Sequence, residues 1–83
     1  MNIIVDESVF LFLKENRIKL SQDFKKVINH LKENPKMYPK INSNENIRHF
    51  VIKNIEFGYF IDEDFIIIAD CRFTKSHIKL KVR

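Results

Sequence analysis

The chain has 83 residues, of which 45% are apolar and 31% charged, a balance typical of a globular rather than a disordered protein. A chain of this length buries only about 60% of the surface that its unfolded form exposes, so we expect one small domain over residues 1–83. One glycine excludes a glycine-rich phosphate loop, and one cysteine excludes a disulfide framework and a cysteine-based zinc site. No apolar run approaches the ~18 residues of a membrane span and no signal-peptide pattern follows Met1, so we expect a cytoplasmic protein without a membrane partner.

Charge is spread unevenly along the chain, whose formal net charge is +4. Residues 14–40 carry an excess of Lys and Arg, residues 41–71 carry an excess of acids, and residues 72–83 carry five basic side chains and no acid. A basic end on a small protein indicates a polyanion or an acidic protein as partner, and a solvated surface gives the same pattern.

The first half of the sequence predicts a strand and two helices. The β-branched run at residues 3–5 is typical of a strand, and Asp6 offers an N-cap oxygen to a helix that ends near Asn16. Ser21 is a suitable N-cap for a second helix, which Pro35 prevents from continuing. This second helix carries one apolar stripe of 3.6-residue period, formed by Phe24, Val27, Ile28 and Leu31.

The second half of the sequence predicts a sheet. Strand-like runs cover residues 47–52, 55–61 and 65–69, with turns at residues 53–54 and 62–64. The run at 65–69 is apolar on both faces and indicates the central strand. Residues 77–83 alternate strictly, which predicts a half-buried strand with Ile78, Leu80 and Val82 on one face and His77, Lys79, Lys81 and Arg83 on the other.

A strand, a helical hairpin and an antiparallel meander of three to four strands predict an α+β fold of two layers. Two helices cannot bury their apolar stripes on each other and still fill a core, so they must cover one face of the sheet. The other face is left partly open, and we expect the functional side chains there.

Basic residues and histidines near the strand ends form the candidate site. Arg48 and Arg72 are expected to meet on the open face across neighbouring strands, with His49, Lys75 and His77 nearby. Such cations and a titratable imidazole can bind a phosphodiester and stabilise its developing charge, and RNA cleavage then needs no metal because the 2′-hydroxyl is the nucleophile. The competing interpretation is a basic strand, with Lys79, Lys81 and Arg83 outward, that docks on an acidic protein surface; a lone strand histidine is also often only a satisfied polar residue.

Other chemistry is disfavoured by residue type and spacing. The histidines lack metal-ligand spacing, so we expect no metal, no cofactor and no small-molecule substrate. The acids at residues 62–64 fit a turn better than a Mg²⁺ site. We expect Cys71 to be a small buried hydrophobe rather than a nucleophile, and His30 to be a structural or surface residue.

Four segments resemble the RelE/ParE superfamily of small bacterial toxins from type II toxin–antitoxin modules. The helix end at 27–35 is similar to the family's helix that closes on Asn/Ser-Pro, and residues 47–50 resemble the Arg-Arg-Phe-type strand of the ParE branch. Residues 54–64 resemble that branch's hairpin, with Tyr59 on its Tyr position. Residues 69–73 resemble the Ala-x-Cys-Arg-Tyr strand of the YoeB group of ribonuclease toxins.

The resemblance implies a cognate antitoxin that occupies the open groove, and either of two targets. RelE and YoeB branches cut mRNA on the ribosome, which would make His49 the base, Arg48 and Arg72 the phosphate ligands, and Lys75 or His77 the proton donor. The ParE branch inhibits DNA gyrase without nuclease activity. Glu56 stands where the nuclease branch has an Arg, and the C-terminal Tyr of that branch is missing, so a ParE-like gyrase inhibitor is favoured; the alternatives are the ribonuclease and an inactive binding module of the same fold.

Overall fold

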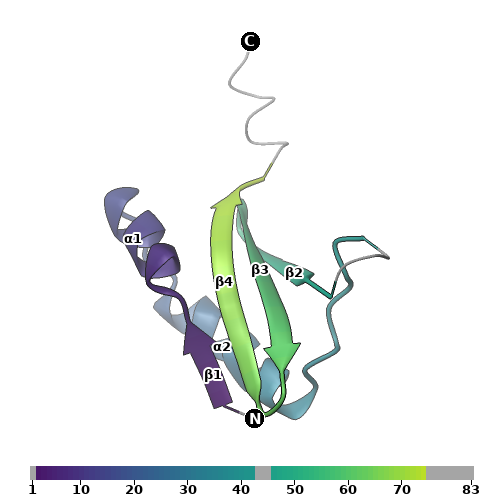
Figure 1. The fold of residues 1–83 in the computed structure, drawn as a ribbon. Helices are drawn as coiled ribbons and strands as arrows, with labels where there is room; N and C mark the ends of the chain where they lie inside the picture. Colours follow the sequence, from purple (N-terminus) through teal and green to yellow (C-terminus); the bar gives the residue numbers. More distant parts are fainter. Residues whose placement is uncertain (1, 43–45, 75–83) are drawn as a thin grey trace.

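The computed structural model describes residues 2–42 and 46–74, whose sheet has four strands in the order β1-β4-β3-β2 (Figure 1). The strands are β1 (Asn2–Val5), β2 (Arg48–Ile52), β3 (Ile55–Asp62) and β4 (Phe65–Phe73). β2, β3 and β4 form an antiparallel meander, and β1 pairs parallel with β4, from which it is separated in sequence by both helices, β2 and β3. The predicted α+β class is confirmed, with a mixed sheet.

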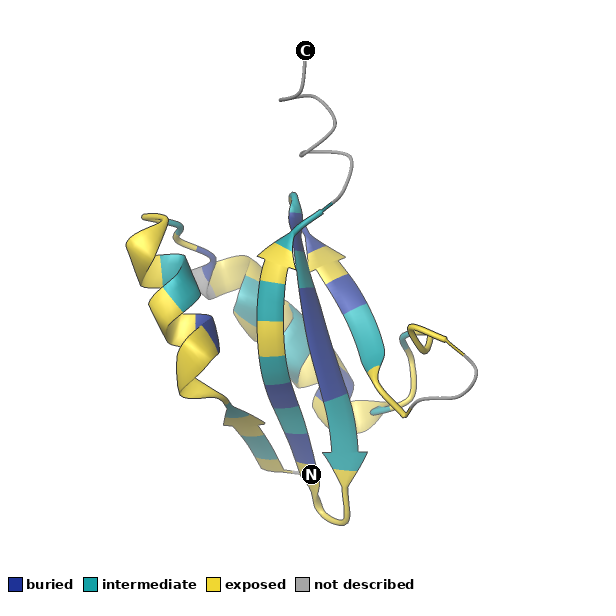
Figure 2. Ribbon diagram, turned by 45° about the horizontal axis from the view of Figure 1, so that its top comes forward, coloured by how far each residue is buried: buried dark blue, intermediate teal, exposed yellow. Residues whose placement is uncertain are grey.

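Two helices, α1 (Glu7–Glu15) and α2 (Ser21–Glu33), lie on one face of this sheet (Figure 2). The Asp6 side chain caps α1 as predicted, by accepting a hydrogen bond of 3.0 Å from the Ser8 backbone N–H. The cap predicted at Ser21 is wrong: Ser21 is the first residue of α2, and Leu20, whose side chain makes no capping bond, precedes it.

The core lies between the helices and the sheet. On β3 the alternate residues Ile55, Phe57 and Tyr59 are at most 1% exposed. The Phe57 ring stacks on Phe50 of β2 at a centroid distance of 5.0 Å and lies 5.4 Å from Phe24 of α2. The apolar stripe predicted for α2 is confirmed, because all four of its residues belong to this core or pack against it. This packing fixes which side chains of each strand face the helices.

A β-bulge in β4 changes the alternation of that strand. Gly58 lies opposite Asp70, while the next residue, Tyr59, lies opposite Ile68, so Ala69 is an extra residue in β4. Before the bulge Ile66 and Ile68 are fully buried beneath the helices; after it Cys71 and Phe73 pack toward the core. Asp70 and Arg72 therefore point to the open face.

The strand bounds differ from those predicted in two places. β4 continues to Phe73, beyond the end expected at residue 69, because it keeps pairing with β3 after the bulge. β4 lies between β1 and β3 as predicted for a central strand, yet β3 is the more buried of the two. The strand predicted at 77–83 lies outside the described residues. No helix among the described residues is long and apolar enough to cross a membrane.

Candidate functional site

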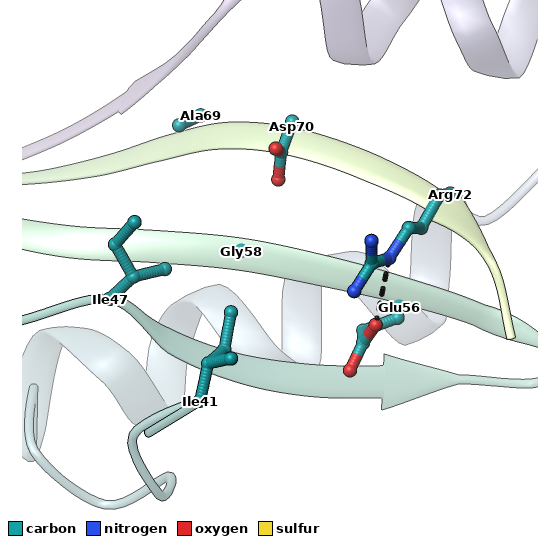
Figure 3. A pocket seen from close by; sticks show the side chains of 7 residues that line it. All are labelled: Ile41, Ile47, Glu56, Gly58, Ala69, Asp70 and Arg72. Atoms are coloured by element: carbon teal, nitrogen blue, oxygen red, sulfur yellow. Dashed lines mark hydrogen bonds and ion pairs between the residues drawn. The ribbon is translucent and has the colours of Figure 1, made fainter. Parts of the chain in front are cut away.

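An imidazole, a carboxylate and a guanidinium group meet on the open face of the sheet, each from a different strand. His49 Nδ1 of β2 lies 2.6 Å from Glu56 Oε2 of β3. Arg72 of β4 donates a hydrogen bond from Nε to Glu56 Oε1 over 3.1 Å, as Figure 3 shows. Glu56 thus bridges the two basic side chains, and we call the set of His49, Glu56 and Arg72 the Glu56 triad.

Strand register places the triad. Arg72 is the direct cross-strand partner of Glu56. The bulge at Ala69 puts Arg72 on the open face, and alternation with the buried Ile55 and Phe57 puts Glu56 there. His49 lies diagonally across from Glu56, since Val51, two residues further along β2, is the direct partner of Glu56. Direct and diagonal neighbours on one face of a sheet are within reach of long side chains.

The electrostatics of the triad favour an ionised carboxylate. The hydrogen bond from His49 is the main cause that lowers the pKa of Glu56, and Arg72 adds to it through its hydrogen bond and its charge. The Glu56 side chain is 22% exposed and that of His49 30%, whereas Arg72 is 69% exposed. The two inner groups are therefore partly shielded from water, and the guanidinium projects into it.

The hydrogen bonds of the triad determine which of its atoms can take up a proton or bind an anion. An ionised carboxylate only accepts hydrogen bonds, so His49 donates through Nδ1–H and Nε2 is left as the acceptor of the neutral ring. Arg72 uses Nε for Glu56, and no other residue in 2–42 or 46–74 occupies its terminal Nη groups, which can serve as donors. Held in this way, His49 can accept a proton and Arg72 can contact an anion, but the carboxylate between them cancels the charge of one cation.

Arg48 does not belong to this site, contrary to the sequence prediction. Its cross-strand partner is Tyr59, which faces the core, so Arg48 also points to the helix side of the sheet. There its Nη1 donates to the carbonyl oxygens of Tyr38 over 2.7 Å and Lys36 over 3.3 Å. Arg48 fixes the segment after α2 and cannot share a phosphate with Arg72.

A hollow of about 130 Å³ adjoins the triad on the open face. Its lining consists of Ile41, Ile47, Glu56, Gly58, Ala69, Asp70 and Arg72. Figure 3 shows Asp70 and Arg72 reaching from β4 toward β3, with Ile41 and Ile47 on the other side of the hollow. Gly58 forms its floor, since a Cβ atom there would lie 2.7 Å from Asp70 Oδ1.

Exposed apolar side chains lie at several places on the open face. Alternation along β1, β2 and β4 directs Ile4, Val51 and Phe65 to this face, where they are 46%, 52% and 40% exposed. Val51 lies opposite Glu56 of the triad, and Ile41 and Ile47 beside the hollow are 43% and 37% exposed, whereas Phe65 lies at the other end of β4, opposite Asp62. Exposed apolar side chains beside a few polar groups are typical of a protein-binding face.

Some of the remaining candidate residues lie outside the described residues, namely Lys75, His77, Lys79, Lys81 and Arg83. Cys71 and His30 lie within them. Cys71 packs against the core, and burial raises the pKa of its thiol to about 11, with Asp70 adding to the shift, so it is not a thiolate at neutral pH. His30 is exposed on α2. Within residues 2–42 and 46–74, no three His, Cys, Asp or Glu side chains are grouped so as to hold a metal ion.

Sequence reasoning missed the bridging role of Glu56 and missed Asp70 entirely. The signal for Glu56 was the two-residue turn at residues 53–54, which fixes the register of the β2–β3 hairpin and so the neighbours of His49. For Asp70 no signal existed, because simple alternation from the buried Ile66 and Ile68 places residue 70 under the helices. A scan against protein-family models and a search of curated proteins find no match to the chain.

Proposed function

We propose that this protein is the toxin of a type II toxin–antitoxin module and that it inhibits growth by binding a protein target in the cytoplasm. DNA gyrase is the target that the resemblance to the ParE branch suggests, and a cognate antitoxin is the partner that neutralises the toxin. The open face is the surface that both partners use.

The charge arrangement of the open face carries this proposal. Phosphate binding was expected to use Arg48 and Arg72 together, but Arg48 donates to carbonyl oxygens on the opposite face and Arg72 is paired with Glu56. The described part of the open face therefore offers no pair of free cations, while it exposes the apolar side chains of Ile4, Val51 and Phe65. A protein surface matches such a face better than a phosphodiester backbone.

A supercoiling assay tests the proposal directly. The purified protein should stop the supercoiling of relaxed plasmid by gyrase, and an open-face variant, Val51→Asp, should lose both this effect and growth inhibition on induced expression. The control is Lys53→Asp in the neighbouring exposed turn, which adds an acid next to β2 but outside its paired residues. Growth arrest by a protein that leaves supercoiling intact would reject gyrase, and expression without any growth defect would reject a toxin and favour a binding module.

The His49–Glu56 hydrogen bond favours a second candidate, a metal-independent ribonuclease acting on ribosome-bound mRNA. In this mechanism His49 Nε2 takes the proton of the 2′-hydroxyl, whose oxygen forms a bond to phosphorus as the P–O5′ bond breaks. The Arg72 Nη groups contact the phosphate oxygens, and Lys75 or His77, both outside the described residues, protonates the leaving 5′-oxygen. The products are a 2′,3′-cyclic phosphate and a 5′-hydroxyl.

Primer extension on ribosome-bound mRNA separates the two candidates. The ribonuclease would give new 5′ ends that disappear in both His49→Ala and Arg72→Ala. Arg48→Ala serves as the control, since it removes a guanidinium on the other face and should leave any cleavage pattern unchanged. Absence of new 5′ ends at protein concentrations that arrest growth would eliminate this candidate.

A further inference from the structure

We propose that the hollow beside Asp70 binds an arginine side chain of the partner protein. This inference rests on the proposed function insofar as it takes the partner of the open face to be a protein, and it adds the chemistry of the contact. The hollow combines apolar walls with the carboxylate of Asp70, which no described residue pairs, and this combination matches the aliphatic stem and charged head of arginine.

The walls of the hollow suit an aliphatic stem. Ile41 and Ile47 are 43% and 37% exposed and stand on one side, and Ala69 contributes to the other. Methylene groups of an arginine side chain gain by covering such surfaces while the charged group remains solvated or paired. The volume of about 130 Å³ has room for the guanidinium group and the methylenes next to it.

Asp70 supplies the charge that selects the head group. Among residues 2–42 and 46–74 its carboxylate has no hydrogen-bond or ion-pair partner, whereas both oxygens of the neighbouring Glu56 are engaged by His49 and Arg72. Since the charge of Arg72 is balanced by Glu56, the hollow holds one negative charge in excess. A cation is favoured there, and a phosphate group is disfavoured by two carboxylates.

The geometry favours arginine over lysine. A guanidinium presents parallel N–H donors that match the two oxygens of a carboxylate, whereas an ammonium is a compact point charge without this fork. Gly58 contributes by having no side chain, because a Cβ atom there would lie 2.7 Å from Asp70 Oδ1 and would displace the carboxylate. The glycine thus keeps the carboxylate accessible across the floor of the hollow.

An NMR titration of the full chain tests this inference without gyrase or antitoxin. Gly58 is the one glycine of the sequence, so its amide signal can be recognised in a ¹⁵N correlation spectrum and reports on the floor of the hollow. We expect N-acetyl-arginine amide to shift this signal with an affinity at least ~10-fold higher than that of the uncharged citrulline analogue, because the charge-assisted bond to Asp70 is lost in the latter.

Two variants and one control sharpen the titration. Asp70→Asn should remove the preference for arginine, and Gly58→Ala should weaken it while leaving the charge in place. Asp62→Asn changes an exposed acid at the far turn of the β3–β4 hairpin and should bind like the parent. An equal response to citrulline, or an unchanged preference in Asp70→Asn, would overturn the inference.

The outcome separates this inference from the proposed function. Selective arginine binding by a protein that leaves supercoiling intact would reject gyrase and keep the hollow as an arginine site. Inhibition of gyrase without a preference for arginine would keep gyrase as the target and reject the hollow as an arginine site. A Gly58 shift produced by guanosine monophosphate in preference to N-acetyl-arginine amide would show a nucleotide site and contradict the arginine assignment.

Discussion

Arg48 and Arg72 lie on opposite faces of the sheet, Arg48 with the buried Tyr59 and Arg72 with Glu56. Their roles follow from these neighbours. Arg48 donates to two backbone carbonyl oxygens of the segment that follows α2, and Arg72 projects into solvent, where its Nε is the group that it uses toward other described residues. One of the two expected functional arginines is therefore structural.

The different roles of Arg48 and Arg72 give the first prediction. Arg48→Ala should lower the free energy of unfolding by about 1–2 kcal/mol, because it leaves two carbonyl oxygens without their donor. Arg72→Ala should cost less than about 1 kcal/mol, as expected for an exposed ion pair, yet should reduce growth inhibition more. Urea denaturation and induced expression measure the two effects. Equal stability losses in the two variants would contradict the assignment.

The Glu56 triad gives a prediction about pH. Because the pKa of Glu56 is lowered on folding, its stabilising contribution is present above its ordinary pKa of 4.5 and is lost as the pH falls through the folded value. Glu56→Gln should therefore be less stable than the parent by about 1 kcal/mol near pH 7. The difference should shrink when both proteins are denatured by urea at successively lower pH below 4.5; a gap that stays constant to pH 3 would show that the carboxylate charge is not what stabilises the parent.

Cys71 provides a test of the core beside the site. Burial raises the pKa of its thiol to about 11, so at pH 8 the folded protein should react with iodoacetamide far more slowly than the same protein in urea. Cys71→Ser should retain growth inhibition, which is expected of a core residue with no nucleophilic role. Rapid labelling of the folded protein, at the rate of the unfolded chain, would be inconsistent with the packing of β4.

Ala69 provides a test of the bulge. As the extra residue of β4, it can be deleted without moving any other side chain of the strand to the opposite face. We expect the deletion variant to fold, with a loss of about 1 kcal/mol from the hydrogen bond that Ser8 Oγ donates to the Ala69 carbonyl. Deletion of Ile67 is the matched control and should abolish folding, because it shifts Ile66 or Ile68 out of the core. Circular dichroism and thermal melting distinguish the two outcomes.

The elements of this fold could be predicted because they depend on local chemistry. The period of the apolar residues in α2, the Asp6 cap and the turn at residues 53–54 each act over a few residues, and all are present in the structure. The helical stripe also identified the part of the core that α2 contributes, since its apolar side chains must leave water together.

The site could be predicted only in part. His49 and Arg72 were chosen for their chemistry and do share the open face, but their link through Glu56 depends on the register of three strands. In sequence Glu56 only marks a departure from the nuclease branch, whereas its position between an imidazole and a guanidinium makes it their common acceptor. The sequence does not show which side chains lie next to Glu56, because that depends on how the strands pair.

Periodicity and residue type are properties of the chain, so they were enough to locate both helices and the four strands of the described sheet, though not the end of β4, and they set the supply of basic and acidic side chains. The tertiary structure alone decided which faces these side chains share. Pairing with Tyr59 turned Arg48 toward the helices, and one extra residue in β4 brought Asp70 and Arg72 to the open face. Side chains of a strand alternate with a period of two, so a single bulge reverses the assignment of every residue beyond it.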